Sequence, residues 1–135
     1  MRLGHLIGLP VAPTVRLICR HGDFRNMTED KFIAAFMAMT PDADPEKHRG
    51  VIETPLYRLI SVLVRDEGEA EKVCADLVKN DGVSSFIFCP GFTSRTLGRL
   101  SEALGPTISI NVARGDGPSN AVARKAMERA CFFKR

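Results

Sequence analysis

Aromatic side chains are scarce: the 135 residues include no Trp and a single Tyr. Proteins that bind single-stranded nucleic acid stack bases on aromatic rings, and this chain offers few of them. The formal net charge is +3, and its basic excess lies in residues 116–135, which hold five Lys or Arg and two Asp or Glu. A nucleic-acid-binding domain usually carries a basic stripe on its folded body. The sequence therefore disfavours a nucleic-acid partner.

Long apolar runs and cysteine pairs are also missing. No uncharged apolar run approaches the roughly 18 residues of a membrane span, so we expect no membrane partner. The four cysteines, Cys19, Cys74, Cys89 and Cys131, form no C-x-x-C pair. The spacing thus predicts neither a metal site nor a redox motif, and no motif indicates a cofactor. Reduced thiols of this kind are typical of a cytoplasmic protein.

Glycine and proline divide the chain into two unequal parts. Residues 1–30 are interrupted by Gly4, Gly8, Pro10, Pro13 and Gly22, too often for a long element. We therefore predict a flexible N-terminal extension over residues 1–30 and one α/β domain over residues 31–135. Because the ordered pattern begins at Lys31, Met27 would be a natural start of the protein.

Short apolar runs, uncharged over residues 32–39, 59–64, 86–89 and 108–112, predict four strands over residues 32–39, 57–64, 83–89 and 107–112. Helical spacing predicts helices over residues 45–52, 67–79, about 94–104 and from 119 onward. In the last of these helices, the residues expected to face inward are Val122, Ala126, Ala130 and Phe133. Alternation of this kind predicts a small four-stranded, mainly parallel α/β sheet with helices on its faces. The alternative is a ferredoxin-like α+β fold, in which the sheet would be antiparallel.

Capping residues mark the starts of two of these helices. Asp66 with Glu69 three residues later forms a capping-box pattern before the helix over residues 67–79. Asp44 followed by Pro45 predicts the start of the short helix over residues 45–52. Thr54 and Pro55 would end that helix.

The carboxyl ends of parallel strands lie at one edge of a sheet, where ligands usually bind. His48, Glu53 and Cys89 are the candidate catalytic residues that this topology would gather there. Cys89 ends a strand just before a helix, a position that favours a reactive thiol, although a small buried thiol fits the pattern too. His48 would act as a base and Glu53 would orient it; a core histidine and an exposed charge are the alternatives.

The segment Gly91, Phe92, Thr93 and Ser94 is the candidate anion-binding loop. Backbone N–H groups at the start of a helix can hold a negative charge. Pro90 removes one such donor, and the segment has neither a Walker pattern nor G-x-G-x-x-G. A plain capped loop is the alternative.

Two segments resemble a small uncharacterised prokaryotic α/β family. Residues 42–55, D-A-D-P-E-K-H-R-G-V-I-E-T-P, are similar to the family's G-A-D-P-E-K-H-R-A-V-I-E-T-P block, and residues 86–92 are similar to its strand ending in C-G-G-F-G. The resemblance covers residues 31–114 and supports Met27 as the start. It implies roles for His48, Arg49, Glu53 and Cys89, and places Arg49 among the ligand-binding residues. It implies no activity.

Together these observations predict a small-molecule or anion site at the carboxyl edge of the sheet. They leave open whether the protein is an enzyme. The alternative is a non-catalytic assembly module that forms a homodimer through a sheet edge or through the helix over residues 119–133, because four strands leave both sheet edges unpaired.

Overall fold

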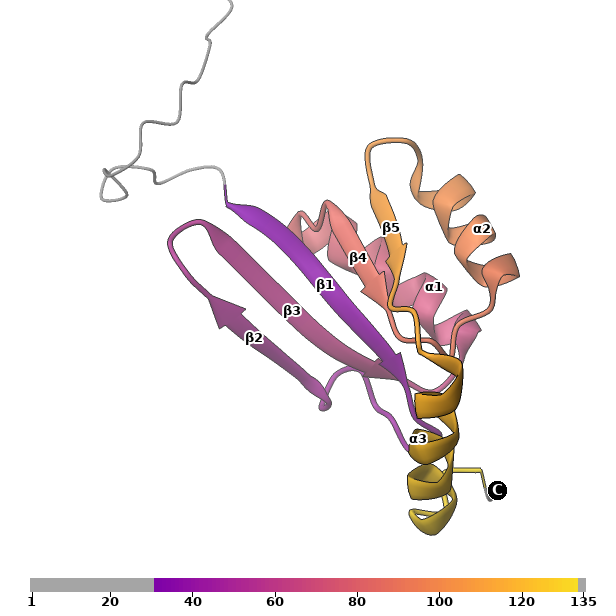
Figure 1. Cartoon of the computed structure of the whole chain (residues 1–135). Helices are drawn as coiled ribbons and strands as arrows, with labels where there is room; N and C mark the ends of the chain where they lie inside the picture. The colour runs from indigo at the N-terminus through magenta and orange to yellow at the C-terminus, as the bar shows by residue number, and fades with distance from the viewer. Residues whose placement is uncertain (1–30, 134–135) are drawn as a thin grey trace, which may run out of the picture.

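The computed structural model describes residues 31–133, so the predicted extension over residues 1–30 and the start at Met27 lie outside the described residues. Figure 1 shows the arrangement of the elements. In chain order they are β1 (Phe32–Met39), β2 (Arg49–Glu53), β3 (Tyr57–Val64), α1 (Glu67–Asp76), the π-helical segment η2 (Leu77–Asp81), β4 (Ser85–Phe88), α2 (Ser94–Leu104), β5 (Ser109–Val112) and α3 (Gly117–Arg129). Within residues 31–133, no helix has the length and apolarity needed to span a membrane.

The five strands form one sheet in the order β2-β3-β1-β4-β5. β1 pairs in parallel with β3 and β4, and β4 pairs in parallel with β5. The predicted α/β class and the four predicted strands are therefore confirmed, and the parallel pairing excludes the ferredoxin-like alternative. The predicted strand number was wrong, because β2 adds a fifth strand that pairs antiparallel with β3.

β2 occupies the segment for which a helix over residues 45–52 was predicted. Asp44 does start a helical turn: its carboxylate accepts a hydrogen bond from the N–H of Glu46, and its carbonyl accepts one from the N–H of His48. The turn ends there because Arg49–Glu53 pairs with β3 across a tight turn at Thr54, whose N–H donates to the carbonyl of Tyr57. Pairing with a distant strand thus overrides a correct local start signal.

Both covering helices lie on the same face of the sheet, which corrects the prediction of helices on its faces. The α1 crossover leads from β3 to β4 and the α2 crossover leads from β4 to β5, so both steps move in the same direction across the sheet. Right-handed crossovers that move in one direction place their helices on one side. The only step in the other direction, from β1 to β3, contains β2 in place of a long helix.

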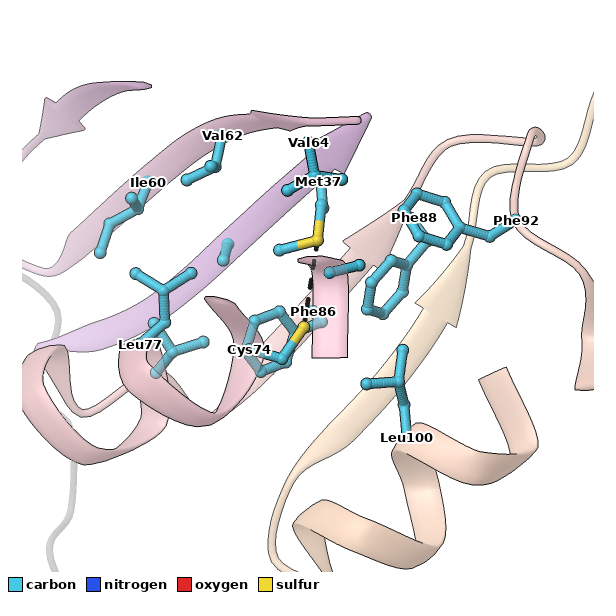
Figure 2. Packing of buried hydrophobic residues seen from close by; sticks show 13 residues of the cluster. Met37, Ile60, Val62, Val64, Cys74, Leu77, Phe86, Phe88, Phe92 and Leu100 are labelled. Carbon is cyan, nitrogen blue, oxygen red and sulfur yellow. Dashed lines mark hydrogen bonds between the residues drawn. The ribbon is translucent and has the colours of Figure 1, made fainter. Parts of the chain in front are cut away.

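The hydrophobic core fills the space between this covered face and the two helices. Figure 2 shows Met37, Ile60, Phe86 and Phe88 of the sheet pointing toward Cys74 and Leu77 of the helical layer. The rings of Phe86 and Phe88 stack with centroids 5.9 Å apart, and Phe92 meets Phe88 edge-on at 4.9 Å. These side chains are fully or almost fully buried.

The opposite face of the sheet, here called the open face, contributes nothing to this core. Alternation along the strands assigns to it the residues between the core positions. They are Phe32, Ala34, Phe36 and Ala38 of β1, Ile52 of β2, Tyr57, Leu59, Ser61 and Leu63 of β3, Ser85 and Ile87 of β4, and Ser109 and Asn111 of β5. None of them carries a charge, and the rings of Phe32 and Tyr57 touch with centroids 5.3 Å apart.

α3 extends from the carboxyl edge of the sheet and has no buried residue (Figure 1). The prediction that Val122 and its partners face inward was therefore wrong; Val122 is 70% exposed. Asp116 caps the helix by accepting from the N–H and the hydroxyl of Ser119, so α3 begins at Gly117, before the predicted start at residue 119. The amphipathic spacing correctly indicates a helix, but no part of residues 31–133 buries the apolar side of α3.

Candidate functional site

Three loops meet at the carboxyl edge of the parallel strands. The loop after β1 begins at Thr40, whose N–H donates to the carbonyl of Val64 at the end of β3. The loop after β4 begins at Cys89, and the loop after β5 begins at Ala113, whose N–H donates to the carbonyl of Phe88. This edge is where the site was predicted.

Glu53 lies at the opposite end of the sheet, where the parallel strands begin. It pairs with Arg58 near the start of β3, and its carboxylate contacts the Lys31 ammonium at 2.5 Å. The expected gathering of Glu53 with Cys89 was therefore wrong, because it required residues 45–52 to be a helix. The hydrogen bond from Lys31 and its charge lower the pKa of Glu53, so this carboxylate is an anion that serves a surface ion pair.

His48 stays near the carboxyl edge, but it is exposed and does not share an inward face with Val51. Its Nδ1 accepts a hydrogen bond from the N–H of Asp44 at 2.9 Å. In the neutral imidazole the proton is therefore on Nε2, which points away from this contact. The ring is oriented, but no carboxylate is hydrogen-bonded to it among the described residues.

Arg49 takes part in an ion-pair group beside the covered face. Its guanidinium lies 3.7 Å from the carboxylate of Asp81, which Arg58 approaches at 3.6 Å. The side chains of Arg49 and Asp81 also line a depression of about 220 Å³ between β2 and the end of α1. The side chain of Arg49 thus ties the edge strand to η2 and does not reach the loop after β4.

Cys89 and the residues after it form a tight loop over the sheet. Cys89 is half-buried, and its N–H donates to the carbonyl of Met37. A Cβ added to Gly91 would lie 3.4 Å from the Cys89 sulfur and 3.5 Å from the Met39 methyl group. Phe92 then turns into the core, 5% exposed. The loop is packed closely against the strand ends, and Phe92 anchors it.

The predicted anion site at the start of α2 is already occupied by a carboxylate of the protein itself. Thr93 caps α2, and both its N–H and its hydroxyl donate to Oε1 of Glu67, at 3.2 and 2.9 Å. Pro90 supplies no N–H, and the N–H of Phe92 donates to the carbonyl of Cys89. Few backbone donors of residues 91–94 therefore remain for an external anion.

Glu67 joins the first turns of α1 and α2. A hydrogen bond from the Thr96 hydroxyl, followed by the one from the Thr93 N–H, lowers the pKa of Glu67. Arg99 adds its charge from α2, 4.0 Å from Glu67 and 2.9 Å from Glu71. Glu67 was not among the predicted site residues. Its place in the first turn of a helix is the one signal that the sequence offers, and the sequence does not show that the Thr93 cap lies beside it.

A cleft of about 300 Å³ opens at the carboxyl ends of β1 and β3. Its lining is mostly apolar and consists of Met39, Thr40, Pro41, Arg65, Phe132 and Phe133. The two phenylalanines follow α3, where Cys131 adopts a left-handed φ of 57° and reverses the chain. Their rings meet nearly perpendicular, with centroids 5.7 Å apart.

Arg65 is the single charged residue in this lining, and sequence reasoning missed it. It directly follows β3, which is the position from which parallel strands deliver side chains to their carboxyl edge. Its N–H and its guanidinium both donate to Glu69, each at 2.7 Å. Asp66 accepts the N–H of Glu69 as the capping box predicts, but the Glu69 carboxylate returns to Arg65 in place of Asp66.

Cys74 of α1 leads to a prediction about alkaline stability. Burial, followed by the charge of Glu71, raises the pKa of this thiol from 9.0 to about 12. The folded chain keeps the proton while the unfolded chain releases it, so the contribution of Cys74 to stability is complete below about pH 9 and is lost as the pH rises toward about 12. Between about pH 8 and about pH 10, we expect the free energy of unfolding to fall more steeply in the wild type than in Cys74→Ala. The difference between the two slopes should reach up to about 1.4 kcal/mol per pH unit. Urea titrations at several pH values measure this difference, and equal slopes would refute it.

No group of three or more His, Cys, Asp or Glu side chains within residues 31–133 is arranged to hold a metal ion. A search of curated proteins and a search of solved structures each find no match to the chain. A family model described as "Family of unknown function (DUF6506)" matches residues 32–128. The match covers nearly the whole described fold, from β1 to the last turn of α3. The prediction of an uncharacterised family is thus confirmed, and the chain belongs to DUF6506, a family of unknown function.

Proposed function

We propose that the protein binds a small organic carboxylate in the cleft between β1, β3 and the residues that follow α3. The observation that supports this proposal is a single guanidinium, Arg65, beside a mostly apolar lining. Ligand sites commonly combine an apolar wall with a few polar groups that fix orientation, and a volume of about 300 Å³ is at the small end of their range. The cleft therefore suits a compact ligand.

The chemistry of the lining favours an anion that has an apolar body. A guanidinium has five N–H donors, and the hydrogen bond from the Arg65 guanidinium to Glu69 uses one of them. The Thr40 hydroxyl already donates to Asp42 at 2.6 Å, so the Arg65 guanidinium is the side chain in the lining that would donate to a bound carboxylate. The rings of Phe132 and Phe133 offer apolar contact to a hydrocarbon group.

Binding rather than catalysis is the function that this lining supports. Met39, Pro41 and the two phenylalanines carry no group that transfers a proton or attacks a substrate. Catalytic roles for His48, Glu53 and Cys89 stay predictions. Of these three residues, His48 and Cys89 lie near the carboxyl edge, while Glu53 is at the other end of its strand.

Replacing Arg65 by methionine tests this function. Charge-assisted hydrogen bonds contribute about 1.5–3 kcal/mol, so we expect the affinity of Arg65→Met for a bound carboxylate to fall about tenfold or more. Benzoate, phenylacetate and hexanoate are suitable probes, measured by calorimetry and by chemical-shift mapping of the backbone amides. Perturbed amides should include Thr40 and Phe132.

Arg95→Met is the matched control, because it removes the same charge from an exposed position on α2. It should bind each probe as the wild type does. Equal losses in the two variants would reduce the effect to net charge and contradict the proposal. Failure of all three probes to shift any amide of the cleft would contradict it as well.

A second candidate function is assembly of two copies, and the uncharged open face favours it. Phe32, Ile52 and Leu63 on this face are 50%, 68% and 38% exposed. Contiguous apolar surface of this kind is typical of a protein–protein contact. A dimer that forms through the open face would bury these side chains.

A further inference from the structure

We infer that α3 of one copy lies across the open face of a second copy, and that the reciprocal contact forms a two-fold dimer. This inference rests on the assembly function proposed above and names the surface that covers the open face. Two apolar surfaces lack a partner within residues 31–133, and they belong to the same chain. One is the open face; the other is the stripe on α3 formed by Val122, Ala126 and, at the end of the helix, Ala130. Phe133, which lines the cleft, is not part of this stripe.

α3 needs a packing partner. It has 13 residues and none of them is buried. Isolated helices of this length are marginal in water, and most helices in proteins are stabilised by packing of their apolar side. The Asp116 cap and the ion pair between Arg124 and Glu128 add only local support.

The open face needs a cover, and no helix within residues 31–133 of its own chain is in a position to supply one. Both crossover helices are on the other side of the sheet because of the handedness of the connections. α3 stands beyond the carboxyl edge and contributes no residue to the core (Figure 1). A second copy supplies an identical α3, which has no buried residue of its own, to this face.

The dimensions of the two surfaces agree. Four spacings of about 4.8 Å separate the outer strands of a five-stranded sheet, which gives a width of about 19 Å. Thirteen helical residues at about 1.5 Å each give a length of about 20 Å. β1 is about 26 Å long at about 3.3 Å per residue, so the face covers about 500 Å² in projection. Each copy buries its face and its α3, and together these approach the roughly 800 Å² per partner of a stable interface.

The charges are also compatible. The open face has no charged side chain, so no charge on it must be desolvated. Arg129, seven residues after Val122, lies on the same side of α3 as the apolar stripe, in the last turn, where its long side chain can extend to water. Arg124 and Glu128 lie on the side away from Val122, by the helical spacing of 100° per residue. These two side chains would stay in water at the rim of the contact.

The test begins with the mass of the full chain in solution, by light scattering after size exclusion. We expect a dimer at about micromolar concentration. Val122→Asp and Ile52→Asp place a charge on α3 and on the open face, and each should raise the dimer dissociation constant about a hundredfold, since each change occurs in both contacts. The controls are Ala121→Asp and Val51→Asp, which place the same charge on neighbouring exposed residues that face away. Both should remain dimeric.

Mixing the two monomeric variants distinguishes this arrangement from others. A mixed dimer of Val122→Asp with Ile52→Asp retains one contact in which both surfaces are native, so part of the dimer should return on mixing. If Ile52→Asp is monomeric while Val122→Asp stays dimeric, assembly through the open face stands and the role of α3 is refuted. A wild-type chain that is monomeric at tens of micromolar would overturn both.

Discussion

Phe86→Ala should lower the free energy of unfolding by about 3–5 kcal/mol, which is the range for truncating a buried phenylalanine. Phe86 is fully buried on β4, opposite Ala35 of β1 and Ile110 of β5. Its ring stacks on Phe88, and Figure 2 shows it directed at the helical layer near Cys74. Because neighbouring strands hold the backbone of β4 on both sides, the core cannot collapse freely into the cavity.

Chemical denaturation followed by circular dichroism measures this loss. The total stability of a domain of this size is about 5–15 kcal/mol, so the variant should unfold at a much lower denaturant concentration. Phe32→Ala is the matched control, since it removes the same ring from a half-exposed position on the open face. Phe32→Ala should lower the free energy of unfolding by less than about 2 kcal/mol. Equal losses from the two substitutions would contradict the assignment of Phe86 to the core.

Ala35→Asp should prevent folding altogether. Ala35 is fully buried at the centre of β1 and faces the core, between Ile60 of β3 and Phe86 of β4. A carboxylate at this position would be buried among apolar side chains, where an unpaired charge costs several kcal/mol. The excess volume adds strain to a packed interior. We expect the purified variant to lack cooperative thermal unfolding and to resist refolding from urea.

The control for this prediction is Ala38→Asp, three residues later on the same strand. Ala38 is opposite Leu63 on the open face and is partly exposed. Its carboxylate can reach water in a single copy, so the variant should keep a cooperative transition. Proteolysis and thermal scans distinguish the two variants. A folded Ala35→Asp, or an Ala38→Asp that fails in the same way, would show that the two faces of β1 are assigned incorrectly.

The parallel strands could be predicted from the sequence because their apolar runs are short, uncharged and separated by capped helices. Asp66 caps the helix that follows it, as expected, and Thr93 caps α2. β2 could not be predicted in this way. Its helical start signal at Asp44 is real, but the strand exists because β3 offers it a pairing edge, and local propensity does not report that edge.

The candidate site could be predicted only in its location. The carboxyl edge followed from the parallel topology, and it does contain a cleft. The residues that line the cleft come from segments far apart in the sequence, such as Arg65 after β3 and Phe133 at the end of the chain. The anion-binding role of residues 91–94 stays a prediction, and the sequence does not show that Glu67, from another helix, accepts the Thr93 N–H. No spacing rule connects residue 67 with residue 93.

The position of β1 has a consequence for how the chain is made. Of the five strands within residues 31–133, β1 is the first to leave the ribosome, yet it is the middle strand of the sheet. Its eight residues are all apolar, and its two neighbouring strands are synthesised later, the second of them complete only at Phe88. Until then both edges of this strand are open to other nascent chains, because distant pairings must wait for long loops to close. Aggregation during synthesis should therefore depend on β1 more than on any later strand.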